Sequence, residues 1–239
     1  MEKRDGLPLA ADDVDGLAYA AHGIHLGTTP QECAYLCHQT ISRIMVRMKY
    51  LALLALVASL GATPAFTASS PDLVTGVFTS QYTLHAFGCN GSNISPAVAW
   101  KNAPAGTQSF ALQVHDENAA AGAAFWHWTV YNIPGTATGL ARGAGNAGGA
   151  LPAPAFGGTN DFVDTGATGA NGAYGGPCPA PGDKPHRYVF TVYALSVPDI
   201  DAAAGIPKSG SPDLYSFILN KGLAAKVLGK TSFTVTYGR

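Results

Sequence analysis

The stretch Tyr174-Gly-Gly-Pro-Cys-Pro-Ala-Pro-Gly-Asp-Lys-Pro-His-Arg-Tyr-Val-Phe-Thr-Val-Tyr193 says most about the fold. Its glycines and prolines predict a rigid turn, and the aromatic and β-branched residues that follow predict a strand. Side chains two residues apart in a strand face the same way, so His186 and Tyr188 share a face with the apolar Phe190. Polar groups on a core face need hydrogen-bond partners or a ligand, and the strand therefore predicts part of a binding site.

The composition indicates one β-rich domain with extra material at the N-terminus. The chain has 239 residues, 47% of them hydrophobic, with 29 Gly and 16 Pro. This suits one domain with a sizeable core, and many turns favour a β-rich fold with long loops over a helical bundle. From Ser69 to Arg239 nine basic residues balance nine acidic ones. The balance argues against a nucleic-acid or anionic-membrane partner.

Residues 45–68 have the layout of a secretory signal peptide. A basic stretch from Met45 precedes an apolar run from Leu51 to Leu60, and small residues follow as far as Ala68. The run is well short of the ~20 residues of a membrane span, so we expect cleavage and no stable span afterwards. An N-terminal anchor or a buried helix is the alternative. The expected product is a domain over residues 69–239, in a periplasm or outside the cell.

Residues 1–44 precede this segment, although a signal peptide normally begins the chain. The simplest interpretation is that translation starts at Met45 or Met48, which makes 1–44 a non-native upstream extension, or else a disordered one. A weak pattern of zinc-ligand types also lies in this region, and we predict no metal site from it. Its members are His25, Cys33, Cys37 and His38.

Several segments predict regular structure. Strands are expected over 109–116, where apolar and polar residues alternate, and over 126–133, 187–195 and 233–237. The eleven glycines and many alanines of residues 135–172 predict a long surface excursion without strands. A helix is expected after Ser211, with that serine as its N-cap and Gly229 as its stop.

Together these segments resemble the phosphatidylethanolamine-binding protein family, in its bacterial branch of Raf kinase inhibitor-like proteins. The resemblance runs from about Phe78 to Arg239 and implies a mainly β fold, a β-sandwich with a few short peripheral helices and the long Gly/Ala-rich loop. It also implies a small pocket for anionic groups such as phosphate, acetate or a phospholipid head group. The motifs that carry it are Cys89-Asn-Gly-Ser-Asn-Ile-Ser-Pro-Ala-Val-Ala-Trp100, Asn102-Ala-Pro-Ala-Gly-Thr-Gln-Ser-Phe-Ala-Leu112, Phe125-Trp-His-Trp-Thr-Val-Tyr-Asn-Ile-Pro134, Asn160-Asp-Phe162 and Tyr174 to Tyr193.

The resemblance also implies the residues of the pocket. The family builds it from the Asp that opens a D-P-D-A-P motif, the His of a tryptophan-flanked strand, and the His and Tyr of an H-R-Y strand. The sequence departs at Asp116-Glu-Asn-Ala-Ala120, where both prolines and the second Asp are missing, and we expect a looser pocket rim. By position the implied ligand-binding residues are Asp116, His127, His186 and Tyr188, with Gly176 and Pro177 in the turn that lines the wall.

The chemistry of these residues suits anion binding without a reaction. Imidazole N–H groups and the Tyr188 hydroxyl can donate to an anion, while Asp116 can accept from an imidazole and fix its tautomer. If His127 or His186 is protonated in the complex, binding weakens as the pH rises past ~6.5. Each residue also has an ordinary alternative: His127 as a core histidine, Asp116 as a turn cap and Tyr188 as a core tyrosine.

Cys89 and Cys178 are the only cysteines after the signal-like segment. In an exported protein such a pair most simply forms one disulfide, here closing a loop of about ninety residues and stabilising the fold by roughly 2 to 4 kcal/mol. Two free thiols or a catalytic cysteine are the alternatives.

The leading functional hypothesis is a non-enzymatic exported protein that binds a small anion or a phospholipid head group, without a cofactor. A second is inhibition of a protease or another protein, because family members resemble inhibitors of kinases and serine carboxypeptidases. A third is a metal-dependent or hydrolytic enzyme that uses Asp116, His127 and His186. The sequence lacks the G-x-S-x-G, H-E-x-x-H and P-loop motifs that would favour this third class.

Overall fold

The computed structural model describes residues 38–47, 63–120 and 124–239. The chain divides into two units, Met1–Thr63 and Pro64–Arg239. In the first unit residues 38–47 form a helix, while the cysteines of the zinc-ligand pattern and the apolar run of the signal-like segment lie outside the described residues. No helix in the described ranges is long and apolar enough to cross a membrane.

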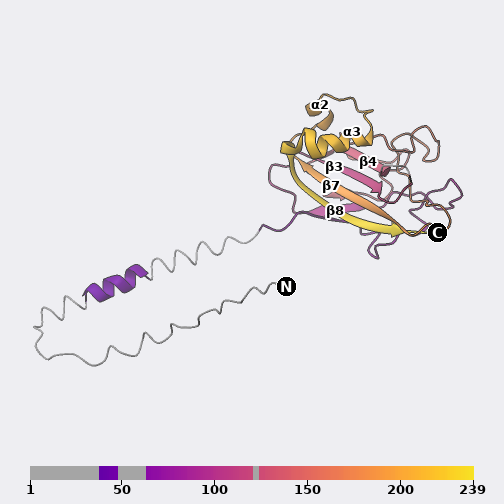
Figure 1. Cartoon of the computed structure of the whole chain (residues 1–239). Coiled ribbons are helices and arrows are strands. Elements are labelled where there is room, and N and C mark those ends of the chain that lie inside the picture. The colour runs from indigo at the N-terminus through magenta and orange to yellow at the C-terminus, as the bar shows by residue number, and fades with distance from the viewer. Residues whose placement is uncertain (1–37, 48–62, 121–123) are drawn as a thin grey trace, which may run out of the picture. The chain divides into compact units, whose positions relative to one another are not determined.

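The second unit is a sandwich of two antiparallel sheets, which confirms the expected mainly β fold (Figure 1). The smaller sheet has the order β1-β2-β5 and the larger one the order β6-β4-β3-β7-β8. The strands are β1 Thr67–Ser69, β2 Val98–Lys101, β3 Ser109–Asp116, β4 Phe125–Pro134, β5 Gly139–Leu140, β6 Phe156–Gly157, β7 His186–Leu195 and β8 Val227–Tyr237.

The core lies between the two sheets, where apolar side chains of both interdigitate. Trp100 of β2 meets Phe110 of β3 with ring centroids 5.0 Å apart. On β7, Tyr188, Phe190 and Val192 are all buried in this same cluster. The alternation predicted for this strand is therefore confirmed, and the end of β7 that carries His186 lies at the edge of the core.

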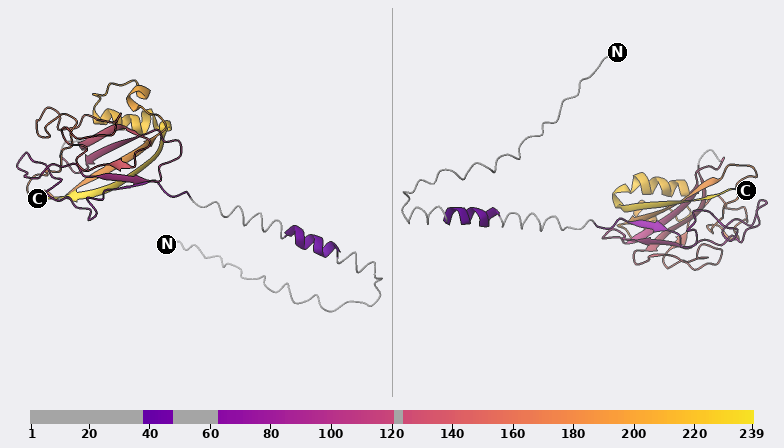
Figure 2. Two further views of the ribbon diagram at one scale, coloured as in Figure 1. Left: turned by 180° about the vertical axis from the view of Figure 1, so that it is seen from behind. Right: turned by 90° about the horizontal axis from the view of Figure 1, so that it is seen from below.

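Two short helices, α2 (Ile200–Ala204) and α3 (Pro212–Phe217), cover the outer face of the larger sheet (Figure 2). The Ser211 hydroxyl accepts a hydrogen bond from the Leu214 backbone N–H, as predicted for the N-cap.

The predicted end of this helix is wrong. After α3 the chain runs through a π-helix, Ile218–Gly222, and a 3₁₀-helix, Ala224–Lys226. Gly229 lies in β8 opposite Ala194, because the chain from Val227 onward pairs with β7 as a strand.

The residues just before Ser69 pack on the sandwich. Phe66 stacks on Phe110 at 6.2 Å, and Ala68 pairs with Trp100 in the β1–β2 ladder. The second unit accordingly includes these residues, and cleavage after Ala68 would cut through β1.

The Gly/Ala-rich loop of residues 135–172 is tied to the sandwich at several points. It contributes the two short strands β5 and β6, contrary to the expectation of no strands, because backbone pairing does not need bulky side chains. Gly145 passes so close to Trp128 that a Cβ there would lie 2.4 Å from the indole Cε2. The loop thus needs its glycines for close approach to the core as well as for turns.

Candidate functional site

A β-bulge in β4 aims His127 into the sandwich. In the β3–β4 ladder Val114 pairs with Trp128 and His115 pairs with Trp126, so His127 is the extra residue between two consecutive pairs. Trp126 and Trp128 consequently lie on opposite faces of the sheet, although simple alternation would place them on the same face. Bulges often re-aim a side chain next to a functional site, and this one places His127 beside Tyr188, with ring centroids 5.1 Å apart.

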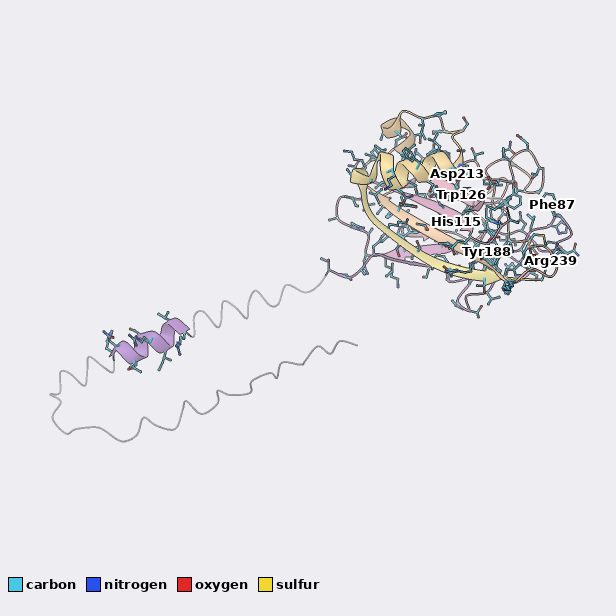
Figure 3. All side chains as sticks on the ribbon, viewed as in Figure 1. Phe87, His115, Trp126, Tyr188, Asp213 and Arg239 are labelled. Atoms are coloured by element: carbon cyan, nitrogen blue, oxygen red, sulfur yellow. A yellow bond between two sulfur atoms is a disulfide. The ribbon has the colours of Figure 1, made fainter. Side chains whose placement is uncertain are left out.

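The flanking tryptophans are used structurally. Trp126 packs on His115 at 5.1 Å, and its Nε1 donates to the Asp213 carboxylate at 2.9 Å (Figure 3). These three residues lie on the helix-covered side of the sheet, whereas Trp128 is buried in the core against Tyr174.

The four polar residues expected at the site line one cavity of about 430 Å³. Asp116 comes from the end of β3, His127 from the bulge of β4, and the other two from the start of β7. The volume falls within the range of small-molecule pockets. The residues that the structure brings together here are Asp116, His127, His186 and Tyr188.

Gly176 and Pro177 do not line this cavity, although the resemblance placed them in its wall. They stand behind it: the Gly176 N–H donates to the Asn93 side chain at 2.8 Å, and the Pro177 carbonyl accepts from the Leu84 N–H at 3.2 Å. The wall at this place is formed by the residues that follow, Cys178, Pro179 and Ala180.

His186 is held between two carboxylates. Its Nδ1 lies 2.7 Å from Asp116 Oδ2, and its Nε2 lies 3.5 Å from Asp183 Oδ2. Because a carboxylate accepts, Nδ1 carries a hydrogen in this bond, as expected for Asp116 as an orienting group. The other oxygen of Asp116 accepts from the Asn118 backbone N–H at 2.8 Å.

His127 is fixed in one tautomer by the backbone. Its Nδ1 lies 2.8 Å from the Gly175 carbonyl oxygen, which can only accept, so Nδ1 carries the hydrogen of the neutral ring. Burial lowers the pKa of His127 to about 4, despite the opposing influence of the Gly175 carbonyl and of Asp116. At neutral pH the ring is uncharged, and its remaining nitrogen, Nε2, is a hydrogen-bond acceptor.

Tyr188 is 1% exposed, and its hydroxyl lies near the Asp116 carboxylate without forming a hydrogen bond of good geometry to any described residue. Burial, and then the nearby Asp116 carboxylate, raise the pKa of Tyr188, so the hydroxyl keeps its proton. A buried group without a partner marks a place where a ligand or an ordered water completes the bonding.

The cavity is acidic and largely apolar. Asp161 and Asp183 join Asp116 in its lining, and none of the described residues that line it is Lys or Arg. Burial raises the pKa of Asp161. Sequence reasoning did not assign these two acids to the site, although Asp161 stands in the Asn160-Asp-Phe162 motif. The walls are mostly apolar, and they include Leu84, Phe87, Phe125 and Phe162.

The rim keeps an acceptor where the expected second Asp is missing. The Asn118 side-chain oxygen accepts from the Arg187 backbone N–H at 2.9 Å. Together with the Asp116–Asn118 bond, this ties the start of the rim to β7. Residues 121–123, farther along, lie outside the described residues.

A disulfide joins Cys89 and Cys178, as predicted. Cys178 lines the cavity, so the bond fixes one wall to the loop at Cys89. Arg239 supports the same loop, since its Nη1 donates to the Gly88 carbonyl at 2.9 Å. The exposed Phe87 projects from this loop at the cavity mouth, 64% exposed and with a φ of 53°.

Several known proteins are similar to this chain in sequence and in fold. The UPF0098 protein YbcL of Escherichia coli K12 is 40% identical over 169 residues, which cover 70% of this chain and 86% of YbcL. YbhB of the same organism is 38% identical over 125 residues, 52% of this chain and 74% of YbhB. The crystal structure of E. coli YbcL, described as a member of the mammalian PEBP family, superposes with a TM-score of 0.64 at 37% identity, covering 74% of this chain and 99% of that structure.

A more distant structure has the same fold. A phosphatidylethanolamine-binding protein homolog from Chlamydia trachomatis superposes with a TM-score of 0.52 at 22% identity, over 73% of this chain and 98% of its own. The family profile described as phosphatidylethanolamine-binding protein matches residues 74–238. This range contains both sheets apart from β1, and every residue that lines the cavity. The chain therefore belongs to the phosphatidylethanolamine-binding protein family, in the branch that contains YbcL and YbhB.

Proposed function

We propose that this chain is an exported, non-enzymatic binding protein whose pocket takes small oxyanions, such as phosphate or the phosphate of a phospholipid head group. The observation that carries the proposal is that two polar groups lie at one cavity and are available to a ligand. They are the Tyr188 hydroxyl, for which no hydrogen bond is found among the described residues, and the His127 Nε2, the ring nitrogen not bonded to Gly175. The apolar walls around them suit a ligand in which the oxyanion is esterified to a carbon chain.

The arrangement favours binding over a reaction. Both Asp116 oxygens accept hydrogen bonds. The nucleophile types among the described lining residues are occupied, since Cys178 is in the disulfide and the Thr165 hydroxyl donates to the Phe162 carbonyl, so no activated nucleophile accompanies His127 Nε2. Among the described residues no group of three or more His, Cys, Asp or Glu is arranged to hold a metal ion.

Isothermal titration of the purified chain with inorganic phosphate and with methyl phosphate tests the binding role. We expect saturable binding of both, weakened in Tyr188→Phe. Asp213→Asn is a matched control, because Asp213 lies on the opposite face of the sheet and bonds Trp126. Absence of binding at millimolar ligand, or equal weakening in the control variant, would contradict the proposal.

Three observations support export: the signal-like segment, the disulfide, and similarity to a protein of Mycobacterium tuberculosis that carries the name lipoprotein LppC. That relative is 38% identical over 112 residues, 46% of this chain and 48% of its own length. Mass spectrometry of the protein recovered outside the cytoplasm tests this. We expect an N-terminus after the apolar run and no later than Pro64, which keeps β1 whole; an N-terminus before Met45 would contradict it.

A further inference from the structure

The pocket offers an oxyanion more acceptors than donors. Three carboxylates line it, and the neutral His127 ring adds an acceptor at Nε2. No Lys or Arg among the described lining residues offsets these groups. An oxyanion whose oxygens are all bare would turn lone pairs toward lone pairs here, whereas one that keeps a hydroxyl can donate a hydrogen bond.

We propose that this pocket selects oxyanions that carry an acidic proton, such as the monoanion of a phosphate monoester, over aprotic oxyanions of the same charge and shape, such as a sulfate monoester, with His127 Nε2 accepting the hydrogen bond from that proton. The proposal rests on the proposed function, because it concerns the ligand of the same site. The Tyr188 hydroxyl is the complementary donor to a bare oxygen of the ligand.

The tautomer of His127 is what imposes this selection. The bond from Nδ1 to the Gly175 carbonyl, at 2.8 Å, leaves Nε2 without a hydrogen in the neutral ring. The ring is also wedged between Phe125, Phe162 and Tyr188, with centroids 5.1, 5.4 and 5.1 Å away, so it cannot flip without repacking the wall. To donate from Nε2 to an aprotic anion while keeping the Gly175 bond, His127 would have to become an imidazolium, which its burial opposes.

The carboxylates that line the cavity with His127 also favour a protonated monoanion over a dianion. The Coulomb repulsion between the ligand and the lining carboxylates is about twice as large for a dianion as for a monoanion. A phosphate monoester loses its second proton with a pKa of about 6, so raising the pH removes both the charge match and the donor. The titratable groups that line the cavity with His127 are Asp116 from β3, His186 and Tyr188 from β7, and Asp161 and Asp183 from the loops. His115, on the other face of β3, acts on His127 through its charge alone.

Methyl phosphate and methyl sulfate form a matched pair of probes. At pH 5 both are monoanions of nearly the same shape, and only methyl phosphate has a proton to donate. We expect calorimetry on the purified chain to give at least tenfold tighter binding of methyl phosphate at pH 5. At pH 8, where methyl phosphate is a dianion, its affinity falls and that of methyl sulfate stays the same.

Two variants separate the acceptor from the donor. In His127→Gln the side-chain amide can offer an N–H near the place of Nε2, so methyl sulfate should gain affinity and the preference should shrink to less than about threefold. Tyr188→Phe removes a donor that both ligands use, so both should weaken by the same factor and the preference should persist. Thermal unfolding checks that each variant is folded. If His127→Gln does not fold, the affinities of the wild-type chain for methyl phosphate and methyl sulfate still test the proton selection.

The outcomes distinguish this proposal from the proposed function. Equal affinities for the two esters at pH 5, or tighter binding of methyl sulfate, overturn the proton selection and leave oxyanion binding intact. Failure of methyl phosphate, methyl sulfate and inorganic phosphate alike overturns the proposed function and this inference with it. A preference that survives unchanged in His127→Gln overturns the role of His127.

Discussion

The two faces of the larger sheet both bury polar side chains, but they use them differently. On the helix-covered face, Gln113 Nε2 donates to the Tyr131 hydroxyl at 3.1 Å, and the Asn132 amide bonds both Asp201 and the Ile200 N–H. These groups satisfy one another and fasten the helices to the sheet.

On the cavity face, Asp116 and His186 bond each other, but the Tyr188 hydroxyl and His127 Nε2 remain available for hydrogen bonds to a ligand. In the described part of the chain the helix-covered face has one comparable exception, the Tyr215 hydroxyl; the Tyr215 ring stacks on Tyr131 at 3.8 Å and does not line the cavity. The Trp128 indole N–H, buried in the core between the sheets, also lacks a partner there and does not line the cavity either. The difference teaches that burial of polar groups does not by itself identify a binding site. Polar atoms that lack a hydrogen-bond partner and line a cavity do.

The largest expected effect lies on the helix-covered face. Asn132→Ala should lower the free energy of unfolding by about 4 kcal/mol, because the Asp201 carboxylate and the Ile200 N–H lose their partner and Ala tolerates the positive φ poorly. Urea unfolding measures this, and Asn132→Gly is the control without the φ cost. Methyl phosphate affinity should not change in the folded fraction; a change would show that the two faces are not independent.

The next effect concerns acid stability. Burial depresses the pKa of His127 to about 4, so the unfolded state binds more protons than the folded state between pH 4 and the ordinary histidine range. Stability therefore falls as the pH drops through that window, by roughly 3 kcal/mol in total. Urea unfolding of wild type and His127→Gln at several pH values isolates this contribution. Parallel curves for the two proteins would show that the folded-state pKa of His127 is not depressed.

A smaller effect is expected for Tyr188→Phe. Because the hydroxyl has no partner, its removal should change the free energy of unfolding by less than about 0.5 kcal/mol, while ligand affinity falls about fivefold to tenfold. Unfolding and calorimetry on the same sample compare the two. A loss of stability of more than about 2 kcal/mol would instead mean that the hydroxyl bonds Asp116 in the folded protein.

The smallest effect is expected for Asp183, a carboxylate in the cavity lining. Asp183 is half-exposed, with its side chain 49% accessible, and it lies 3.5 Å from His186. Asp183→Asn should strengthen binding of the methyl phosphate dianion about twofold at pH 8 and low salt, and the gain should fade at high salt. Calorimetry at two ionic strengths checks this, and Asp164→Asn, at an exposed loop position, serves as the control.

The sequence predicted what depends on local pattern. Alternation along β7 placed His186, Tyr188 and Phe190 on one face, and the serine before Pro212 marked the start of α3. The family resemblance led to the sandwich and to the four polar residues that meet at the cavity, and the cysteine count led to the disulfide.

Features set by pairing between distant segments were out of reach. The bulge at His127 is visible only in the register against β3, since alternation alone puts it on the wrong face. Gly229 resembled a helix stop until its place opposite Ala194 in β8 was known. The acidic character of the cavity needed the positions of Asp161 and Asp183, which come from two different loops.

The disulfide also divides the molecule into a closed ring and two open arms. Cys89 and Cys178 enclose β2 to β6 within the ring, whereas β7 and β8 lie outside it. A single protease cut anywhere in the Gly/Ala-rich loop of residues 135–172 therefore leaves both fragments covalently attached, and they separate on a gel only after reduction. A cut between Cys178 and His186 instead frees a fragment that carries His186 and Tyr188 even without reduction, so a denaturing gel shows on which side of Cys178 the cut lies.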